Sequence, residues 1–356
     1  MCFSVFVTNT SLFNLLAQQD SSQKLHFEGY LETYYSYDLN ASGKNDKPPF
    51  LCSYNRNNEL NINIGLIQAG YNTTKTRTQL GLMVGTYANV NLAHEPDLLK
   101  NIFEAYAGLK LLNLRDIWID AGIFSSHIGF ESAIGKNCWN LTRGITAENT
   151  PYYESGAKLS YRTPNQKWLI CFLYLNGWQR IQRLSGNFTP AWGHQVMYTG
   201  KNDFVVNSST FVGSLEPDSL RKMRYFHDFY TQFYLTKRLG CIISFDIGVQ
   251  QKSKNSSNYN LWYSWSIVSK YTFSDHSSIA ARVEYYFDDK QVTIFTHTPN
   301  GFQTFGYSLN FDYSLYKNTI FRIEARSFYS KDAIFLLRTK PTHTYYFMTT
   351  SLAVSF

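Results

Sequence analysis

Charged side chains recur at every second position within otherwise apolar segments of the sequence. Arg282 and Glu284 lie two residues apart, and Arg322, Glu324 and Arg326 repeat this spacing. Residues two apart share one face of a β-strand, so each segment would carry a charged face and an apolar face. Rows of this kind can form ion pairs or line a wet channel. The residues expected to face such a channel are Glu28, Glu32, Arg77, Glu104, Lys110, Asp120, Glu154, Lys158, Arg162, Arg282, Glu284, Asp312, Arg322, Glu324 and Arg326.

With Asp228 and Asp246 included, the acidic residues on these faces, ten in all, roughly balance the seven basic ones. We therefore predict weak ion selectivity. Taken singly, each charged residue fits a network of ion pairs better than a binding site of its own.

A long polar segment, 126–151, mixes apolar side chains with charges of both signs. Opposed charges across a constriction set the solute size and ion preference of a pore. We expect the segment to fold into the lumen and narrow it, with Glu131, Lys136, Arg143 and Glu148 at the constriction. An ordinary surface loop is the alternative that the sequence leaves open.

Catalytic and metal-binding patterns are weak. The histidines are scattered, and none lies in a G-x-S-x-G or H-E-x-x-H context. There is no phosphate-binding loop, dinucleotide fingerprint or C-x-x-C pair, so we expect no enzyme, cofactor or metal. Cys52 and Cys138 fall in expected loops, and a disulfide between them is left open.

The elements that must position these charges are short alternating segments separated by turn residues. Connections between them alternate between short and long, which is typical of a transmembrane β-barrel with turns at one end and loops at the other. We therefore predict an all-β fold, an antiparallel transmembrane barrel of about sixteen strands whose long third loop enters the lumen. The expected strands are 25–37, 58–70, 75–88, 102–112, 116–126, 152–162, 167–177, 191–200, 204–213, 223–236, 240–251, 260–272, 278–288, 302–316, 320–330 and 343–356.

The last segment, 343–356, shows the pattern most clearly. Every second residue back from Phe356 is mostly apolar, and the segment has no Pro, Gly or charge. A transmembrane strand needs about 9–11 residues with an apolar lipid-facing side. We expect Phe356 to be the assembly signal through which the last strand engages the barrel-assembly machinery. The last strand of a soluble sandwich is the alternative for this segment alone.

The composition agrees with a membrane β-barrel and argues against a helical membrane protein or a nucleic-acid-binding protein. Aromatic residues make up 17% of the chain and charged residues 17%, against about 25% charged in ordinary soluble domains. The longest strongly apolar run, Trp168–Leu175, is far shorter than the roughly 18 residues of a membrane-spanning helix. The net charge of +7 is scattered, which argues against nucleic-acid binding and suits contact with outer-membrane lipids and lipopolysaccharide.

The amino-terminal segment, residues 1–23, contains no Lys or Arg and has two apolar stretches. We interpret it as a truncated secretory signal peptide that precedes the barrel, residues 24–356. A disordered tail is the alternative.

Four segments carry a family resemblance. Phe27–Asp38, Trp118–Phe124, Trp139–Arg143 and Ala147–Leu159 resemble the β-barrel porin family described as OmpL-like, over about 25–356. The resemblance implies a location in the outer membrane of a Gram-negative bacterium and passive diffusion of small hydrophilic solutes. It supplies no catalytic residues. A homotrimer is expected only by analogy with other sixteen-stranded porins.

The function predicted from the sequence is therefore a general diffusion porin. Two other classes stay open. One is a barrel that serves as an adhesin or surface scaffold, which channel conductance would distinguish. The other is a barrel-embedded hydrolase, which would need a histidine beside a nucleophile near the outer rim.

Overall fold

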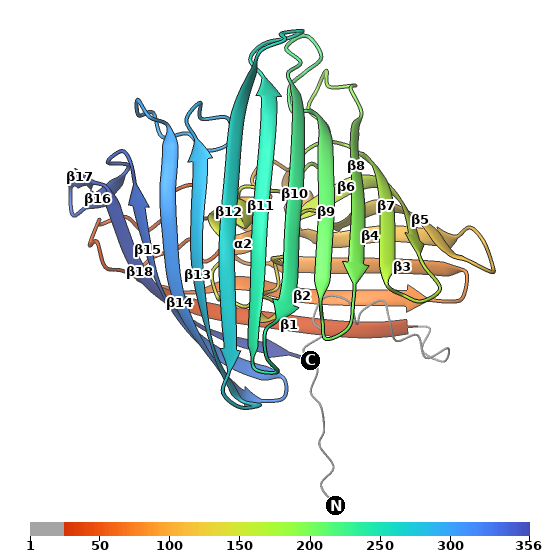
Figure 1. Cartoon of the computed structure of the whole chain (residues 1–356), viewed down its shortest axis with the longest axis horizontal. Helices are drawn as coiled ribbons and strands as arrows, with labels where there is room; N and C mark the ends of the chain where they lie inside the picture. The colour runs from red at the N-terminus through yellow and green to blue at the C-terminus, as the bar shows by residue number, and fades with distance from the viewer. Residues whose placement is uncertain (1–24) are drawn as a thin grey trace, which may run out of the picture.

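Sixteen antiparallel strands close into one barrel in the computed structural model, which describes residues 25–356 (Figure 1). Each strand pairs with its neighbours in sequence, and β18 pairs with β1 to close the ring. The barrel strands are β1 (Leu25–Asp38), β2 (Leu60–Asn72), β3 (Thr76–Val84), β4 (Ile102–Lys110), β5 (Asp116–Ser125), β6 (Tyr153–Arg162), β7 (Trp168–Leu175), β8 (Ala191–Thr199), β9 (Val205–Ser214), β10 (Met223–Tyr234), β11 (Leu239–Gln251), β12 (Tyr259–Thr272), β13 (Ser277–Asp288), β14 (Phe302–Tyr316), β15 (Thr319–Ser330) and β18 (Thr344–Ser355). The predicted all-β fold, a closed antiparallel barrel of sixteen strands, is confirmed.

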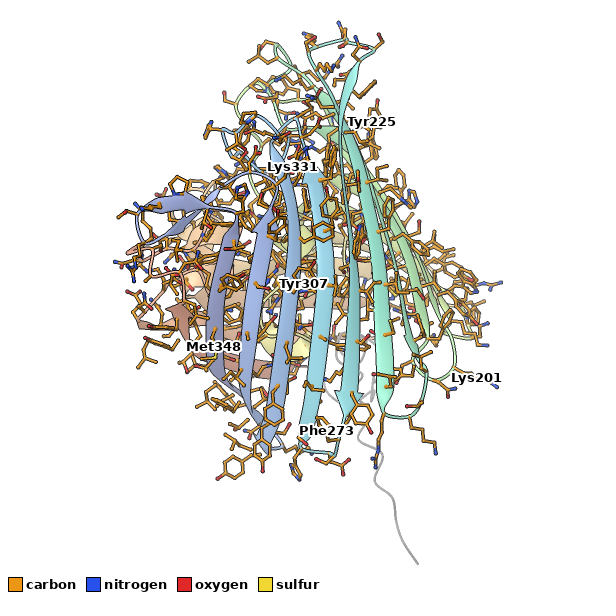
Figure 2. All side chains as sticks on the ribbon, turned by 60° about the vertical axis from the view of Figure 1, so that its left-hand side comes forward. Lys201, Tyr225, Phe273, Tyr307, Lys331 and Met348 are labelled. Atoms are coloured by element: carbon orange, nitrogen blue, oxygen red, sulfur yellow. The ribbon has the colours of Figure 1, made fainter. Side chains whose placement is uncertain are left out.

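The two faces of each strand differ as the alternating sequence predicts. On β13, Arg282 and Glu284 are buried towards the lumen, whereas Val283 between them is exposed on the outer face. The side chains of Tyr307 and Met348 likewise project outwards from the barrel wall (Figure 2). A continuous apolar outer band of this kind suits contact with lipid, and the closed ring leaves no strand edge unpaired there.

Connections alternate in length round the barrel. The long ones include the segments between β1 and β2 (39–59, here L1), β5 and β6 (126–152, L3), β13 and β14 (289–301, L7), and β15 and β18 (331–343, L8). Short turns join the strands at the other end. In barrels of this type the turns face the periplasm and the loops face outwards, and both ends of the sixteen-stranded ring then lie on the periplasmic side.

The ring closes at the carboxyl terminus. The backbone of Phe356 exchanges two hydrogen bonds with Gly29 of β1, with N–O distances of 2.7 and 3.0 Å. The Phe356 ring also covers Gly29, because a Cβ added there would lie 2.3 Å from a ring carbon. The last residue therefore extends the pairing of β18 with β1.

One strand boundary was predicted wrongly. The third expected strand, 75–88, ends at Val84, because Gly85 has φ +123° and the chain turns into the helix α2 (Thr86–Asn91). The last long connection contains a small hairpin, β16 (Phe335–Leu337) and β17 (Lys340–Thr342). The remaining short helices are η1 (Asp97–Asn101), η2 (Gly135–Asn137) and α3 (Ile145–Glu148). Within residues 25–356, no helix has the length and apolar character needed to span a membrane.

The loop end of the lumen is packed with aromatic side chains, which corrects the expectation of a polar inner face along the whole barrel. Phe50 of L1 lies between Phe302 and Phe328, with ring centroids 4.8 and 5.6 Å away, and Phe335 of L8 packs beside them. The same apolar cluster extends round the wall to Phe226 and to Ile145 of L3. Apolar loop side chains anchored on inward-facing aromatics thus fill this end.

Candidate functional site

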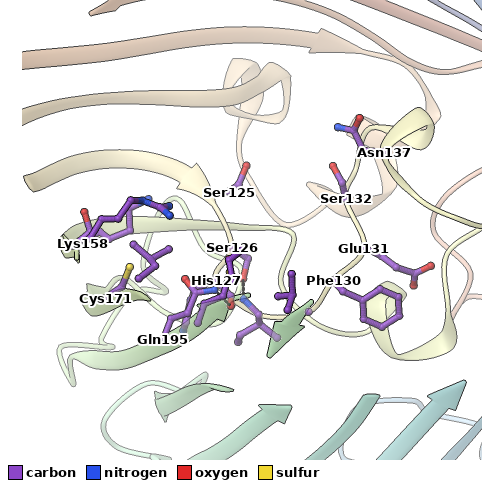
Figure 3. A pocket seen from close by; sticks show the side chains of 18 of the residues that line it. Ser125, Ser126, His127, Phe130, Glu131, Ser132, Asn137, Lys158, Cys171 and Gln195 are labelled. Carbon is purple, nitrogen blue, oxygen red and sulfur yellow. Dashed lines mark hydrogen bonds between the residues drawn. The ribbon is translucent and has the colours of Figure 1, made fainter. Parts of the chain in front are cut away.

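A cavity of about 940 Å³ opens at the short-turn end of the lumen. Its lining runs from the turns of β4–β5 and β6–β7 up to the backbone of L3. Figure 3 shows Lys158, Cys171 and Gln195 on the wall, with His127, Phe130 and Glu131 on the loop beside them. We call this cavity the vestibule.

One side of the vestibule is basic. Arg77, Lys110, Lys158 and Arg162 line it from β3, β4 and β6, and Arg115 joins them from a turn. Arg77 donates two hydrogen bonds of 2.6 Å to the carboxylate of Asp120 on β5, and Lys110 lies 4.0 Å from Asp116. These two cations are therefore partly neutralised by the wall itself.

L3 is attached to the opposite side of the barrel by arginines. Arg322 of β15 pairs with Asp312 at 2.6 Å and donates to the carbonyl oxygens of Gly135, Cys138 and Trp139 at 2.7–3.1 Å. Because Arg322 is fully buried, its charge is stabilised by this one carboxylate and the loop carbonyls. The bonds place the L3 backbone among the inward-facing side chains of mid-strand β14 and β15.

Arg282 of β13 makes the second attachment. It lies 3.1 Å from Glu131 of L3, donates to the Thr142 carbonyl at 2.9 Å and reaches Glu324 of β15 at 3.4 Å. Glu284 also pairs with Arg326 and accepts from the backbone N–H of Ile145 at 2.6 Å. We call Arg282, Glu284, Asp312, Arg322, Glu324 and Arg326 the wall clamp.

L3 also holds itself and L1. Arg143, with no exposed surface, donates to the carbonyl oxygens of Ser132 and Ala133 within the loop. Glu148 accepts from the backbone N–H groups of Cys52 and Ser53 in L1, each at 3.1 Å. L1 and L3 are thus one hydrogen-bonded assembly.

A second, much smaller cavity of about 20 Å³ lies between L3 and the walls of β10–β13. It shares Gly129, Phe130 and Glu131 with the vestibule and is bordered by Asp228 and Asp246. We call it the neck. A space of this size holds about one water molecule.

A family model described as "Putative beta-barrel porin-2, OmpL-like" matches residues 24–356. The chain belongs to this family. With the closed barrel, membership establishes an outer-membrane porin. No curated protein sequence matches the chain.

Solved structures of other barrels share the fold. The outer membrane channel DcaP of Acinetobacter baumannii is 10% identical with a TM-score of 0.63, over 93% of this chain and 97% of that one. The anion-selective porin from Comamonas acidovorans is 11% identical with a TM-score of 0.60, over 93% and 99%. The trimer form of in-vitro folded OmpT from Vibrio cholerae is 10% identical with a TM-score of 0.59, over 93% and 99%. Identity this low supports the fold alone.

In the structure, the residues predicted to line the channel or the constriction fall into three groups. Arg77, Lys110, Lys158, Arg162 and Glu131 line the vestibule, and the wall clamp binds L3. The others take local roles: Glu32 accepts from Tyr54 and Asn63, Glu104 bonds Ser125, and the backbone N–H of Lys136 donates to Tyr30. Glu154 is buried without a hydrogen-bond partner, and Glu28 on β1 faces inwards without a vestibule contact.

Three further points of the sequence analysis concern the cysteines, possible metal ligands and the signal peptide. Cys52 and Cys138 are free thiols, so the disulfide left open by the sequence is absent; Cys138 instead contacts the backbone of Ser132. Within residues 25–356, the His, Cys, Asp and Glu side chains form no group of three placed to hold a metal. The predicted signal peptide, 1–23, lies outside the described residues.

Sequence reasoning missed the contribution of L1. Lys47 is buried 3.9 Å over the ring of Phe347 and donates to Thr349. Burial, together with nearby Arg326, lowers the pKa of Lys47 to about 7. The apolar cluster Pro48–Leu51 was the one local signal that L1 packs inside the barrel.

Proposed function

We propose that this porin is a passive channel for small hydrophilic solutes and ions, with L3 as its constriction. The attachment of L3 to the wall clamp carries the proposal, because it holds the loop backbone across the lumen above the vestibule. A wet cavity lowers the free-energy cost of crossing the membrane, and the loop then limits the size of the solute.

Charges at the constriction are compensated, which supports weak selectivity for small inorganic ions. Arg282 faces Glu131, Glu284 and Glu324 within 3.5 Å, and Arg322 faces Asp312. A compensated network leaves little net field for an ion in passing. The neck is narrow, so we expect a small conductance while L3 stays attached.

We infer a channel without catalysis, on the strength of the porin family. A second function, a surface scaffold with a closed lumen, is favoured by one observation. The aromatic cluster around Phe50 joins L1 and L8 to the wall at the loop end. Channel conductance separates the two functions.

We also propose that the porin assembles as a homotrimer in outer-membrane lipid and lipopolysaccharide, after insertion by the barrel-assembly machinery through β18. The trimer form among barrels of the same fold supports the oligomer. Chemical cross-linking in native membranes tests it, and a ladder that stops at the dimer would contradict it.

The test of the constriction is to replace residues 131–148 with a short Gly-Ser linker. The account predicts a larger single-channel conductance, because the linker leaves the wall clamp without its loop. The matched control shortens 252–258 between β11 and β12, a loop outside the vestibule lining. Equal conductance in the two variants would contradict the proposal.

A further inference from the structure

The vestibule has two unlike walls, and the contrast goes beyond what a general diffusion pore requires. Its basic wall lies on β3–β6, and its other wall lies on β7–β11. In the ring of sixteen, β6 and β7 are neighbours, so the two walls adjoin there, and only their outer strands β3 and β11 lie opposite each other. A solute in the cavity would meet both walls.

Besides Arg115 on a turn, the basic wall presents two cations on a strand that form no ion pair with the described residues. Lys158 and Arg162 lie on the inner face of β6, four residues apart, which is roughly 13 Å along the strand. Within residues 25–356, neither forms an ion pair within 4.0 Å, in contrast to Arg77 and Lys110 on the same wall. Lys158 lies 4.5 Å from the centroid of the Phe124 ring. Because neither Lys158 nor Arg162 donates a side-chain hydrogen bond to another described residue, both can donate to an anion.

The adjoining wall carries an apolar patch beside the polar side chains of Gln195, Thr199 and Gln232. Met197, Val205 and Tyr230 form one buried cluster, with Leu169 of β7 packed against it. Phe130 of L3 completes the surface, with its ring centroid 5.7 Å from that of Tyr230. All five side chains line the vestibule.

The size and access of the cavity suit a small organic molecule. A volume of about 940 Å³ falls within the roughly 300–1,000 Å³ of ordinary small-molecule sites, which combine apolar lining with a few polar groups. The entrance lies at the short turns, so a ligand could enter without passing the neck.

We propose that the vestibule binds small organic anions that carry an apolar body, such as medium-chain carboxylates. Lys158 and Arg162 bind the carboxylate, and the Met197–Val205–Tyr230 cluster holds the hydrocarbon part. This inference deepens the proposed function and rests on it, because it names the solutes that the channel would concentrate at its inner mouth.

The test compares three probes by titration calorimetry on the purified full chain in detergent. Hexanoate has the charge and the apolar body, hexanamide lacks the charge, and acetate lacks the body. We expect hexanoate to bind about tenfold more tightly than either of the others, the size expected from one charge-assisted hydrogen bond or a few buried methylene groups. Equal binding of hexanoate and hexanamide, or no binding of hexanoate, would overturn the proposal.

Two variants test which wall binds the carboxylate and which wall binds the hydrocarbon part of the ligand. The double variant K158Q/R162Q should lose the preference for hexanoate over hexanamide, and Met197→Gln should lose the preference for hexanoate over acetate. Lys252→Gln, outside the vestibule lining, is the control and should bind hexanoate as the native chain does. If K158Q/R162Q binds like this control, the basic wall is not the site. Calorimetry needs no ion flow, so a porin that binds hexanoate but does not conduct refutes only the proposed function.

Discussion

Arg282 of β13 and Glu131 of L3 form an ion pair of 3.1 Å with both side chains buried. The two residues are 151 positions apart in sequence, yet the pair ties a loop that begins after β5 to the far wall of the barrel. Each charge has further partners, so neither is left uncompensated in the lumen. The position of L3 therefore depends on the wall clamp as much as on the loop sequence.

Arg322→Ala should release one end of L3. The change leaves Asp312 without its partner and the carbonyl oxygens of Gly135, Cys138 and Trp139 without their shared donor. Removing one member of a buried ion pair costs about 3–5 kcal/mol, so the urea midpoint of unfolding in lipid vesicles should fall. The conductance of the folded fraction should rise. A lower midpoint with unchanged conductance would show that Arg322 stabilises the barrel without setting the constriction.

Lys47 should make stability depend on pH. Its pKa in the folded chain, about 7, is below the usual value of a lysine near 10.5. Between these values the unfolded chain binds more protons, so stability should rise with pH from 7 to 10. Lys47→Met should be more thermostable than the native chain at pH 7, and the difference should shrink by pH 10. Lys44→Met, at an exposed position of the same loop, serves as the control, and a difference that stays constant with pH would count against this account.

Gly156→Ala should weaken the root of L3. Gly156 pairs with Gly122 across β5 and β6, has φ +152° and would place a Cβ 2.0 Å from the Tyr174 carbonyl oxygen. Strained backbone of this kind costs about 1–3 kcal/mol, and the clash adds to it. Gly43→Ala separates the two effects, because Gly43 also has positive φ but open space around it. If both variants refold at the same urea concentration, the clash is not significant.

Phe356→Ser should impair assembly more than stability. The side chain is 76% exposed, and both backbone bonds to Gly29 survive the change. We expect fewer heat-modifiable barrels in outer-membrane fractions and a nearly unchanged urea midpoint after refolding in vitro. Tyr316→Ser is the matched control, since Tyr316 is an aromatic residue of similar exposure near a short turn. Equal losses in the two variants would refute a role as assembly signal.

The barrel could be predicted because the period of two appears in every strand. The outward face of β18, for example, is readable from Met348 and Leu352 alone. The interior could not be predicted to the same extent. Phe302 and Phe328 follow the same alternation as the inward charges, so no sequence pattern indicated that aromatics fill the loop end. Lys47 becomes significant only when L1 folds back on Phe347, a contact between residues 300 positions apart.

The most direct test of the account is the single-channel conductance of the refolded chain in a planar bilayer, compared with that of the variant in which a linker replaces 131–148. The account predicts small, stable conductance steps with weak ion selectivity for the native chain, and clearly larger steps for the variant. A folded, heat-modifiable barrel that does not conduct in either form would contradict a channel and favour the surface scaffold.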